Sequence, residues 1–141
     1  RQGKVAFDSN NYYFAFINFF MMLEYCFANG KFHKDQVLSE FSNSELLRSC
    51  VDSTISMIPS LGKENNNYAW IVSECEKRHK CYDFDGVIYV LVEYRGILSH
   101  ATKLSKDYML NDIELRPLAF ITNLICRFLC GRIQIYSVKF E

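Results

Sequence analysis

The sequence predicts an all-α domain, and three observations support this fold class. Half of the 141 residues are hydrophobic, whereas only two are proline and six are glycine, which is a poor composition for a β-sandwich with many turns. Apolar residues recur at helical spacing in several long segments. The most apolar of these, Asp85 to Leu104, also carries apolar residues on much of its remaining surface. We expect this segment to be the central helix of one bundle spanning residues 1–141.

The central segment has a second interpretation, because Val87 to Val92 is rich in β-branched residues and also fits a buried strand. The helical spacing continues past Tyr94, which favours the helix. A membrane span needs about 20 mostly apolar residues, and Glu93 and Arg95 interrupt the segment. The sequence therefore predicts a buried helix of a soluble bundle.

Capping residues and helix breakers place the other elements. Asn29 and Gly30 are a stop signal for the first helix, Asn43 or Ser44 is an N-cap, and Gly131 is a stop signal near the C-terminus. The expected helices cover residues 8–28, 45–58, 67–80 and 113–130, with a polar connector at 31–42 that includes a short helical turn, a loop at 60–68, and a closing helix or strand at 132–140.

Charge and cysteine content exclude some classes of function. Sixteen basic residues balance sixteen acidic ones, so no net charge attracts nucleic acid, and self-association is not opposed. The six cysteines are expected to be free and mostly packed in the core of an intracellular protein. No hydrophobic anchor ends the chain, so membrane contact is expected only through a tail outside this sequence.

No nucleophile elbow, P-loop, dinucleotide fingerprint or paired-histidine metalloprotease motif occurs. One spacing is compatible with metal binding: Cys75 and His79 lie one helical turn apart, and Cys81 follows. A fourth ligand at suitable spacing is missing, so a packed cysteine beside a charged helix end is the preferred interpretation. We expect no cofactor and no catalysis, and a small metal-dependent enzyme using these three residues is the alternative.

The order of elements resembles the Bcl-2 family of apoptosis regulators. Leu47 to Asp52 is similar to the third homology motif of that family, although Val51 replaces the usual small residue. Phe84 to Val87 resembles the residues before the family's Asn-Trp-Gly-Arg signature, but the signature itself is replaced by Ile-Tyr-Val-Leu. Arg132 to Gln134 resembles the Trp-Ile-Gln of the second homology motif without its tryptophan. Such divergence is most similar to virus-encoded members.

The resemblance implies a helical bundle that inhibits apoptosis by sequestering the amphipathic death-motif helices of host pro-apoptotic proteins. It places the protein in the cytoplasm or at the mitochondrial surface of the host cell. The implied groove is lined by residues of three consecutive helices and a charge partner that substitutes for the lost signature arginine: Met57, Leu61, Trp70, Ile71, Cys75, Phe84, Tyr89, Leu91 and Arg95. The alternative keeps the fold and makes the protein a homodimer that blocks an inflammatory signalling adaptor.

Overall fold

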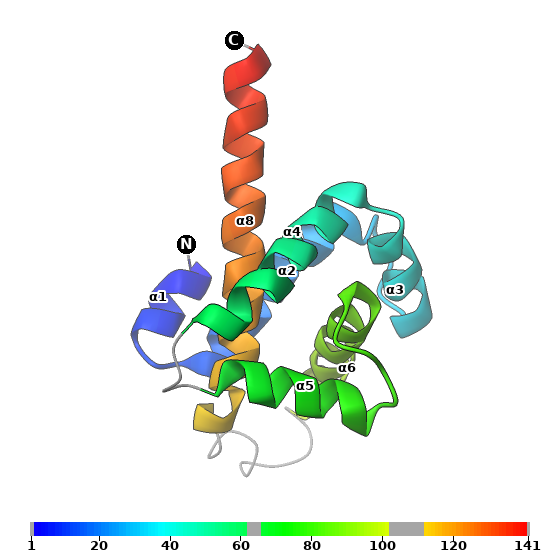
Figure 1. Cartoon of the computed structure of the whole chain (residues 1–141), viewed down its shortest axis with the longest axis vertical. Coiled ribbons are helices and arrows are strands. Elements are labelled where there is room, and N and C mark those ends of the chain that lie inside the picture. Colours follow the sequence, from blue (N-terminus) through cyan, green and yellow to red (C-terminus); the bar gives the residue numbers. More distant parts are fainter. Residues whose placement is uncertain (1, 62–65, 102–111, 141) are drawn as a thin grey trace.

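The protein is all-helical in the computed structural model, which describes residues 2–61, 66–101 and 112–140 (Figure 1). These residues contain no strand, so the all-α prediction is confirmed. The strand alternative for Val87 to Val92 is wrong, because these residues lie inside a helix. The helices are α1 (Gln2–Asp8), α2 (Tyr12–Phe27), α3 (Lys34–Ser42), α4 (Glu45–Met57), α5 (Asn67–Lys77), α6 (Phe84–Ala101) and α8 (Arg116–Phe140), with short 3₁₀ turns η1 (Ile58–Ser60) and η2 (Asp112–Leu115).

Five of the described helices contact one another at the centre of the bundle. Both α2 and α4 contact α6 and α8, and α5 contacts α6 on one side and α8 on the other. Buried side chains of α2, α3, α4, α5, α6 and α8 form one continuous hydrophobic cluster. Helix α6 is buried at Val87, Val90 and Leu91, as its sequence predicts. It shares the centre with α8, which is buried at Leu118 and Ile121.

Local capping explains where several helices begin and end. The Ser44 hydroxyl accepts a hydrogen bond from the Leu47 N–H at 3.1 Å, which confirms it as the N-cap of α4. Helix α5 ends at Lys77, three residues earlier than expected. His79 adopts a left-handed conformation with φ 57°, and the Lys80 N–H donates to the Cys75 carbonyl at 2.9 Å. This is the Schellman arrangement, here with histidine where glycine is usual.

Two elements differ from the expectation. Helix α1 was not predicted, because seven residues are too few to show a clear hydrophobic period. Gly131 does not end the last helix, and α8 continues through it to Phe140. Glycine inside a helix costs only about 1 kcal/mol relative to alanine, which a long helix tolerates. The C-terminal part of α8 therefore extends beyond the other helices (Figure 1).

Length and hydropathy together decide whether a helix can cross a membrane. Within residues 2–61, 66–101 and 112–140, none is both long enough and apolar enough to span a bilayer.

Gly86→Ala tests the packing at the start of α6, and Gly96→Ala, later in the same helix, is the matched control. A Cβ at Gly86 would overlap the Cys81 carbonyl oxygen, whereas a Cβ at Gly96 would meet no atom within 4 Å. We expect Gly86→Ala to lower the free energy of unfolding by about 3 kcal/mol, the upper end of typical overpacking costs. Gly96→Ala should raise it by up to about 1 kcal/mol, because alanine is the better helix former. Urea unfolding of both variants measures the difference, and equal effects would contradict this packing.

Candidate functional site

A cleft of about 750 Å³ opens between α5, α6, η2 and the start of α8. We refer to it as the cleft, and it is lined by Trp70, Ser73, Glu74, Lys77, Arg78, Tyr94, Ile97, Ile113, Glu114, Leu115 and Pro117. Its volume is in the range of ligand-binding pockets, and its lining combines apolar side chains with a few charged ones. Segments far apart in the sequence build it.

The apolar part of the cleft has an aromatic floor and an aliphatic rim. The rings of Trp70 and Tyr94 lie 5.8 Å apart at 36°. Ile97 on α6 and Ile113 on η2 are 38% and 75% exposed. Aliphatic side chains this exposed beside a half-buried aromatic pair leave apolar surface in contact with water, so a partner that covers them gains hydrophobic free energy.

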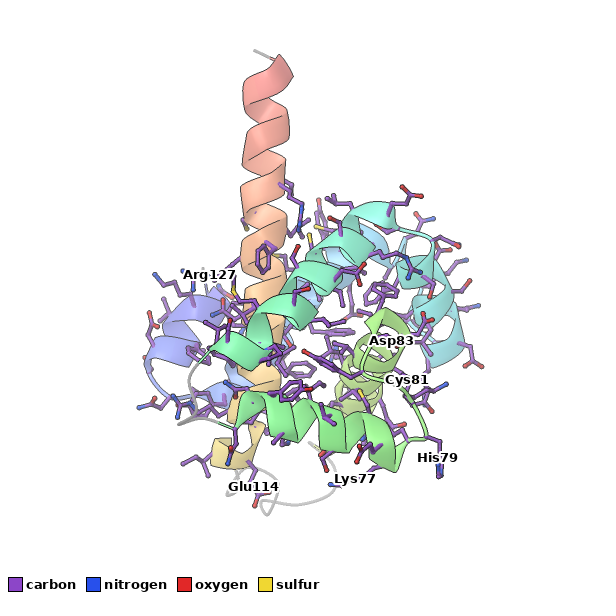
Figure 2. All side chains as sticks on the ribbon, viewed as in Figure 1. Lys77, His79, Cys81, Asp83, Glu114 and Arg127 are labelled. Carbon is purple, nitrogen blue, oxygen red and sulfur yellow. The ribbon has the colours of Figure 1, made fainter. Side chains whose placement is uncertain are left out.

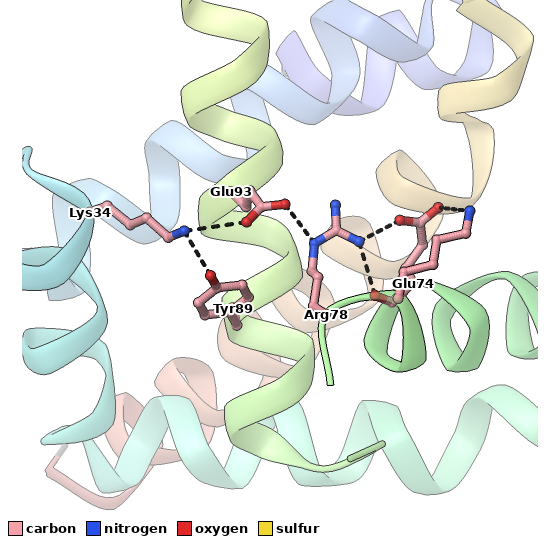
Figure 3. Close-up of polar contacts among 6 residues, drawn as sticks. Lys34, Glu74, Arg78, Tyr89 and Glu93 are labelled. Atoms are coloured by element: carbon pink, nitrogen blue, oxygen red, sulfur yellow. Dashed lines mark hydrogen bonds and ion pairs between the residues drawn. The ribbon is translucent and has the colours of Figure 1, made fainter. Parts of the chain in front are cut away.

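The polar part of the cleft belongs to an ion-pair network centred on Arg78 (Figure 3). Its Nη1 lies 2.6 Å from Oε2 of Glu74 and donates to the Glu74 carbonyl oxygen, and its Nε lies 2.7 Å from Oε1 of Glu93. The guanidinium also lies over the Tyr94 ring. Arg78 is at the C-cap of α5 and Glu93 is on α6, so the arginine fixes these helices to each other.

Lys34 extends the network to α3. Its Nζ lies 3.2 Å from Oε2 of Glu93 and donates a hydrogen bond to the Tyr89 hydroxyl at 2.9 Å (Figure 3). Burial alone raises the pKa of the Glu93 carboxyl, but hydrogen bonds from Arg78 and Lys34 outweigh this and lower the pKa below its ordinary value of 4.5. Burial, followed by the nearby Glu74 carboxylate, raises the pKa of Tyr94 to about 12. At neutral pH, Tyr94 is thus an uncharged phenol.

The three residues of the metal hypothesis do not share one site. Cys75 is buried in the core, whereas His79 and Cys81 are exposed in the connection between α5 and α6 (Figure 2). Burial, with a smaller effect of Asp83, raises the pKa of Cys75 to about 11, so its sulfur is a neutral thiol at pH 7. In the described part of the chain, no three His, Cys, Asp or Glu residues are arranged to hold a metal ion.

Apart from Arg95, the residues of the expected groove lie in four different places. Trp70 lines the cleft. Met57 and Leu61 lie at the two ends of η1, outside the cleft, with Met57 exposed and Leu61 half-buried. Tyr89 contacts Lys34 in the ion-pair network. The other apolar members belong to the hydrophobic core, where each is at most 3% exposed: Ile71, Cys75, Phe84 and Leu91.

The expected charge partner is engaged elsewhere. Nε of Arg95 lies 2.9 Å from Oε1 of Glu24 on α2, and its guanidinium also donates to the Ser99 hydroxyl. Arg95 therefore does not line the cleft. Sequence reasoning missed Arg78, Ile113 and Leu115, which do. The helical period identified Tyr94 and Ile97 only as apolar positions, and the approach of η2 to α5 has no local signal in the sequence.

Comparison with known proteins adds no relative to this geometry. No protein-family model, no curated protein and no solved structure matches the chain significantly.

The role of the network can be tested with Glu93→Gln. At pH 7 we expect this change to lower the free energy of unfolding by about 2 kcal/mol, because Arg78 and Lys34 lose a charged acceptor. The pKa of Glu93 is lowered by folding, so its contribution is fully present above pH 4.5 and is lost as pH falls through the folded-state value. The difference between wild type and variant should therefore shrink as the pH is lowered through and below 4.5.

Urea unfolding across this pH range measures the difference. Glu76→Gln is the control for the loss of a carboxylate charge, because Glu76 on α5 is exposed. We expect the free energy of unfolding of this variant to equal that of the wild type. A difference between wild type and Glu93→Gln that does not change with pH would show that the carboxylate charge is not stabilising.

Proposed function

We propose that the protein is a non-catalytic, Bcl-2-like interaction domain that binds an amphipathic death-motif helix in the cleft and so inhibits apoptosis. The observation that supports this best is the exposed apolar rim, Ile97 and Ile113, beside the floor of Trp70 and Tyr94. An amphipathic helix presents apolar anchors at positions i, i+3 or i+4, and i+7, and inserts them into an apolar groove. The rim and floor offer contacts to such a row of anchors.

The charged residues of the cleft suggest how the partner helix is oriented. A death-motif helix carries an aspartate, which in the Bcl-2 family pairs with the signature arginine. Arg78 is held by two carboxylates, whereas the Lys77 side chain is 65% exposed and only its 3.5 Å contact with Glu74 constrains it. We therefore assign the pairing role to Lys77 in place of Arg95, whose charge is paired with Glu24 on α2.

Calorimetric titration with a panel of death-motif peptides of roughly 25 residues tests this function. At least one peptide should bind with nanomolar to low-micromolar Kd. Ile97→Glu should weaken binding at least about tenfold, because it places a charge on the apolar rim. Tyr25→Glu is the matched control, since Tyr25 is exposed on α2 and does not line the cleft.

Two alanine variants test the assignment of the pairing role to Lys77. Lys77→Ala should weaken peptide binding by several-fold, and Arg95→Ala should leave affinity unchanged while slightly lowering stability. The reverse result would return the pairing role to Arg95. Absence of binding across the panel, from a protein shown to be folded by circular dichroism, would exclude the apoptotic function.

A second candidate function, a homodimer that blocks an inflammatory signalling adaptor, is favoured by the outer face of α2. Phe14, Met21 and Tyr25 are 47%, 51% and 92% exposed and lie at the spacing of one helix face. Glu24, the only charged residue of α2, is already paired with Arg95. A solvent-exposed helix normally carries charges on its outer face, so an uncharged one is typical of an interface.

Sedimentation equilibrium distinguishes this candidate from the first. If α2 forms the dimer interface, the wild-type protein should be a dimer at micromolar concentration and Tyr25→Glu should be a monomer, while Ile97→Glu should remain dimeric. A wild-type protein that is monomeric at high micromolar concentration would reject the dimer.

A further inference from the structure

A second cavity, of about 740 Å³, lies between α1, α2 and α8, and shares no lining residue with the cleft. We refer to it as the slot. Its apolar surface comes from two flexible methionines, one aromatic ring, one buried thiol and two glycines: Met21, Met22, Phe19, Cys126, Gly3 and Gly131.

The backbones of α1 and α8 approach α2 closely on two sides of the slot. A Cβ at Gly3 would lie 2.7 Å from Cε1 of Phe19, so α1 packs on α2 only because this residue has no side chain. On the other side, Sγ of Cys126 lies 3.5 Å from the Phe19 carbonyl oxygen, which brings α8 close to α2. Towards Gly131 the slot is open, since a Cβ there would meet no atom within 4 Å.

The rim of the slot is positively charged. Lys4 on α1 and Arg127 on α8 both line it and are both exposed (Figure 2 labels Arg127). Neither cation has a carboxylate partner among the residues that the structure describes, and no Asp or Glu lines the slot. By contrast, each of the following basic residues is ion-paired with a glutamate: Lys34, Lys77, Arg78 and Arg95.

We propose that the slot binds a single-chain anionic amphiphile of the fatty-acid class. The alkyl chain lies between α2 and α8 against Phe19, Met21 and Met22, and the carboxylate lies at the rim between Lys4 and Arg127. A largely apolar lining that includes two exposed cations without a carboxylate partner among the described residues is complementary to a hydrocarbon chain with an anionic head group. The unbranched methionine side chains adapt to a flexible chain. This site is independent of the proposed function of the cleft.

Calorimetric titration with decanoate, below its micelle concentration, tests the proposal on the intact chain. We expect a Kd of about 10–100 µM, and at least about tenfold weaker binding of decanol, which has the same chain without the charge. The double variant Lys4→Gln/Arg127→Gln should lose the preference for decanoate over decanol. Equal affinity of the wild type for the two ligands would overturn the assignment of the cations.

Gly131→Leu tests the location of the chain. A Cβ at residue 131 meets no atom within 4 Å, so there is space for the start of a larger side chain at the open end of the slot. We expect the leucine to occupy the volume of the alkyl chain and decanoate affinity to fall at least about tenfold. Gly96→Leu is the matched control, because Gly96 is also helical, exposed and free of neighbours but lies on α6. Its affinity should equal that of the wild type. Unchanged binding by a folded Gly131→Leu variant would overturn the proposal.

The rate of cysteine alkylation is an independent test of where decanoate binds. Cys130 is exposed and lines the slot, whereas Cys81 is exposed in the connection between α5 and α6. Saturating decanoate should slow the reaction of iodoacetamide with Cys130 and leave the reaction with Cys81 unchanged, as measured by mass spectrometry of peptides. Equal rates at Cys130 with and without decanoate would overturn the proposal. Binding to anionic phospholipid vesicles without any binding of decanoate would also overturn it, and would assign the cations to a membrane surface.

Discussion

The burial of α2 is the constraint on which the arrangement of the other helices depends. This helix carries a single charged residue, Glu24, and its side chains at Phe16, Phe20 and Leu23 are removed from water almost completely. Aromatic and leucine side chains of this size each contribute about 1.5–3 kcal/mol when buried. An almost uncharged helix must be covered on several sides, and α1, α3, α6 and α8 all contact it. Its one charge is paired with Arg95 of α6, so even the polar contact of α2 fixes a neighbouring helix.

The ion-pair network has a comparable role for the helices that surround the cleft. The Schellman turn ends α5 at the point where Arg78 reaches both Glu74 and Glu93. Half-buried charges are tolerated only when they are paired, and breaking one pair leaves its partner buried without compensation. Because Glu93 accepts from two cations, α3, α5 and α6 are held in one relative position. The network thereby helps to fix Trp70 of α5 relative to Tyr94 of α6, the two rings that form the floor of the cleft.

The sequence predicts helices better than it predicts their contacts. The all-α class, the helical state of Val87 to Val92 and the cap at Ser44 follow from spacing and capping chemistry, which are local properties. The early end of α5 at Lys77 was missed because it depends on a left-handed His79, a conformation that histidine rarely takes. The passage of α8 through Gly131 was missed because the cost of one glycine is small. Apolar residues on one helix face are equally compatible with a core and with a groove. Only tertiary packing decides between them, and it places Ile71 and Leu91 in the core.

The cations proposed to bind partners are those that contribute least to holding the helices together. Arg95 was the candidate for the binding cation because the resemblance to the Bcl-2 family requires a substitute for the lost signature arginine. In the structure, however, Arg95 is paired internally with Glu24. A cation that is already hydrogen-bonded gains little from a new anion, since the old contact must be broken first. By the same argument, Lys77 at the edge of the network and the unpaired Lys4 and Arg127 are the basic residues best placed to bind a partner. On this argument, a cation is available to a partner where its internal ion pair is weak, as at Lys77, or where no carboxylate of the described residues pairs with it, as at Lys4 and Arg127.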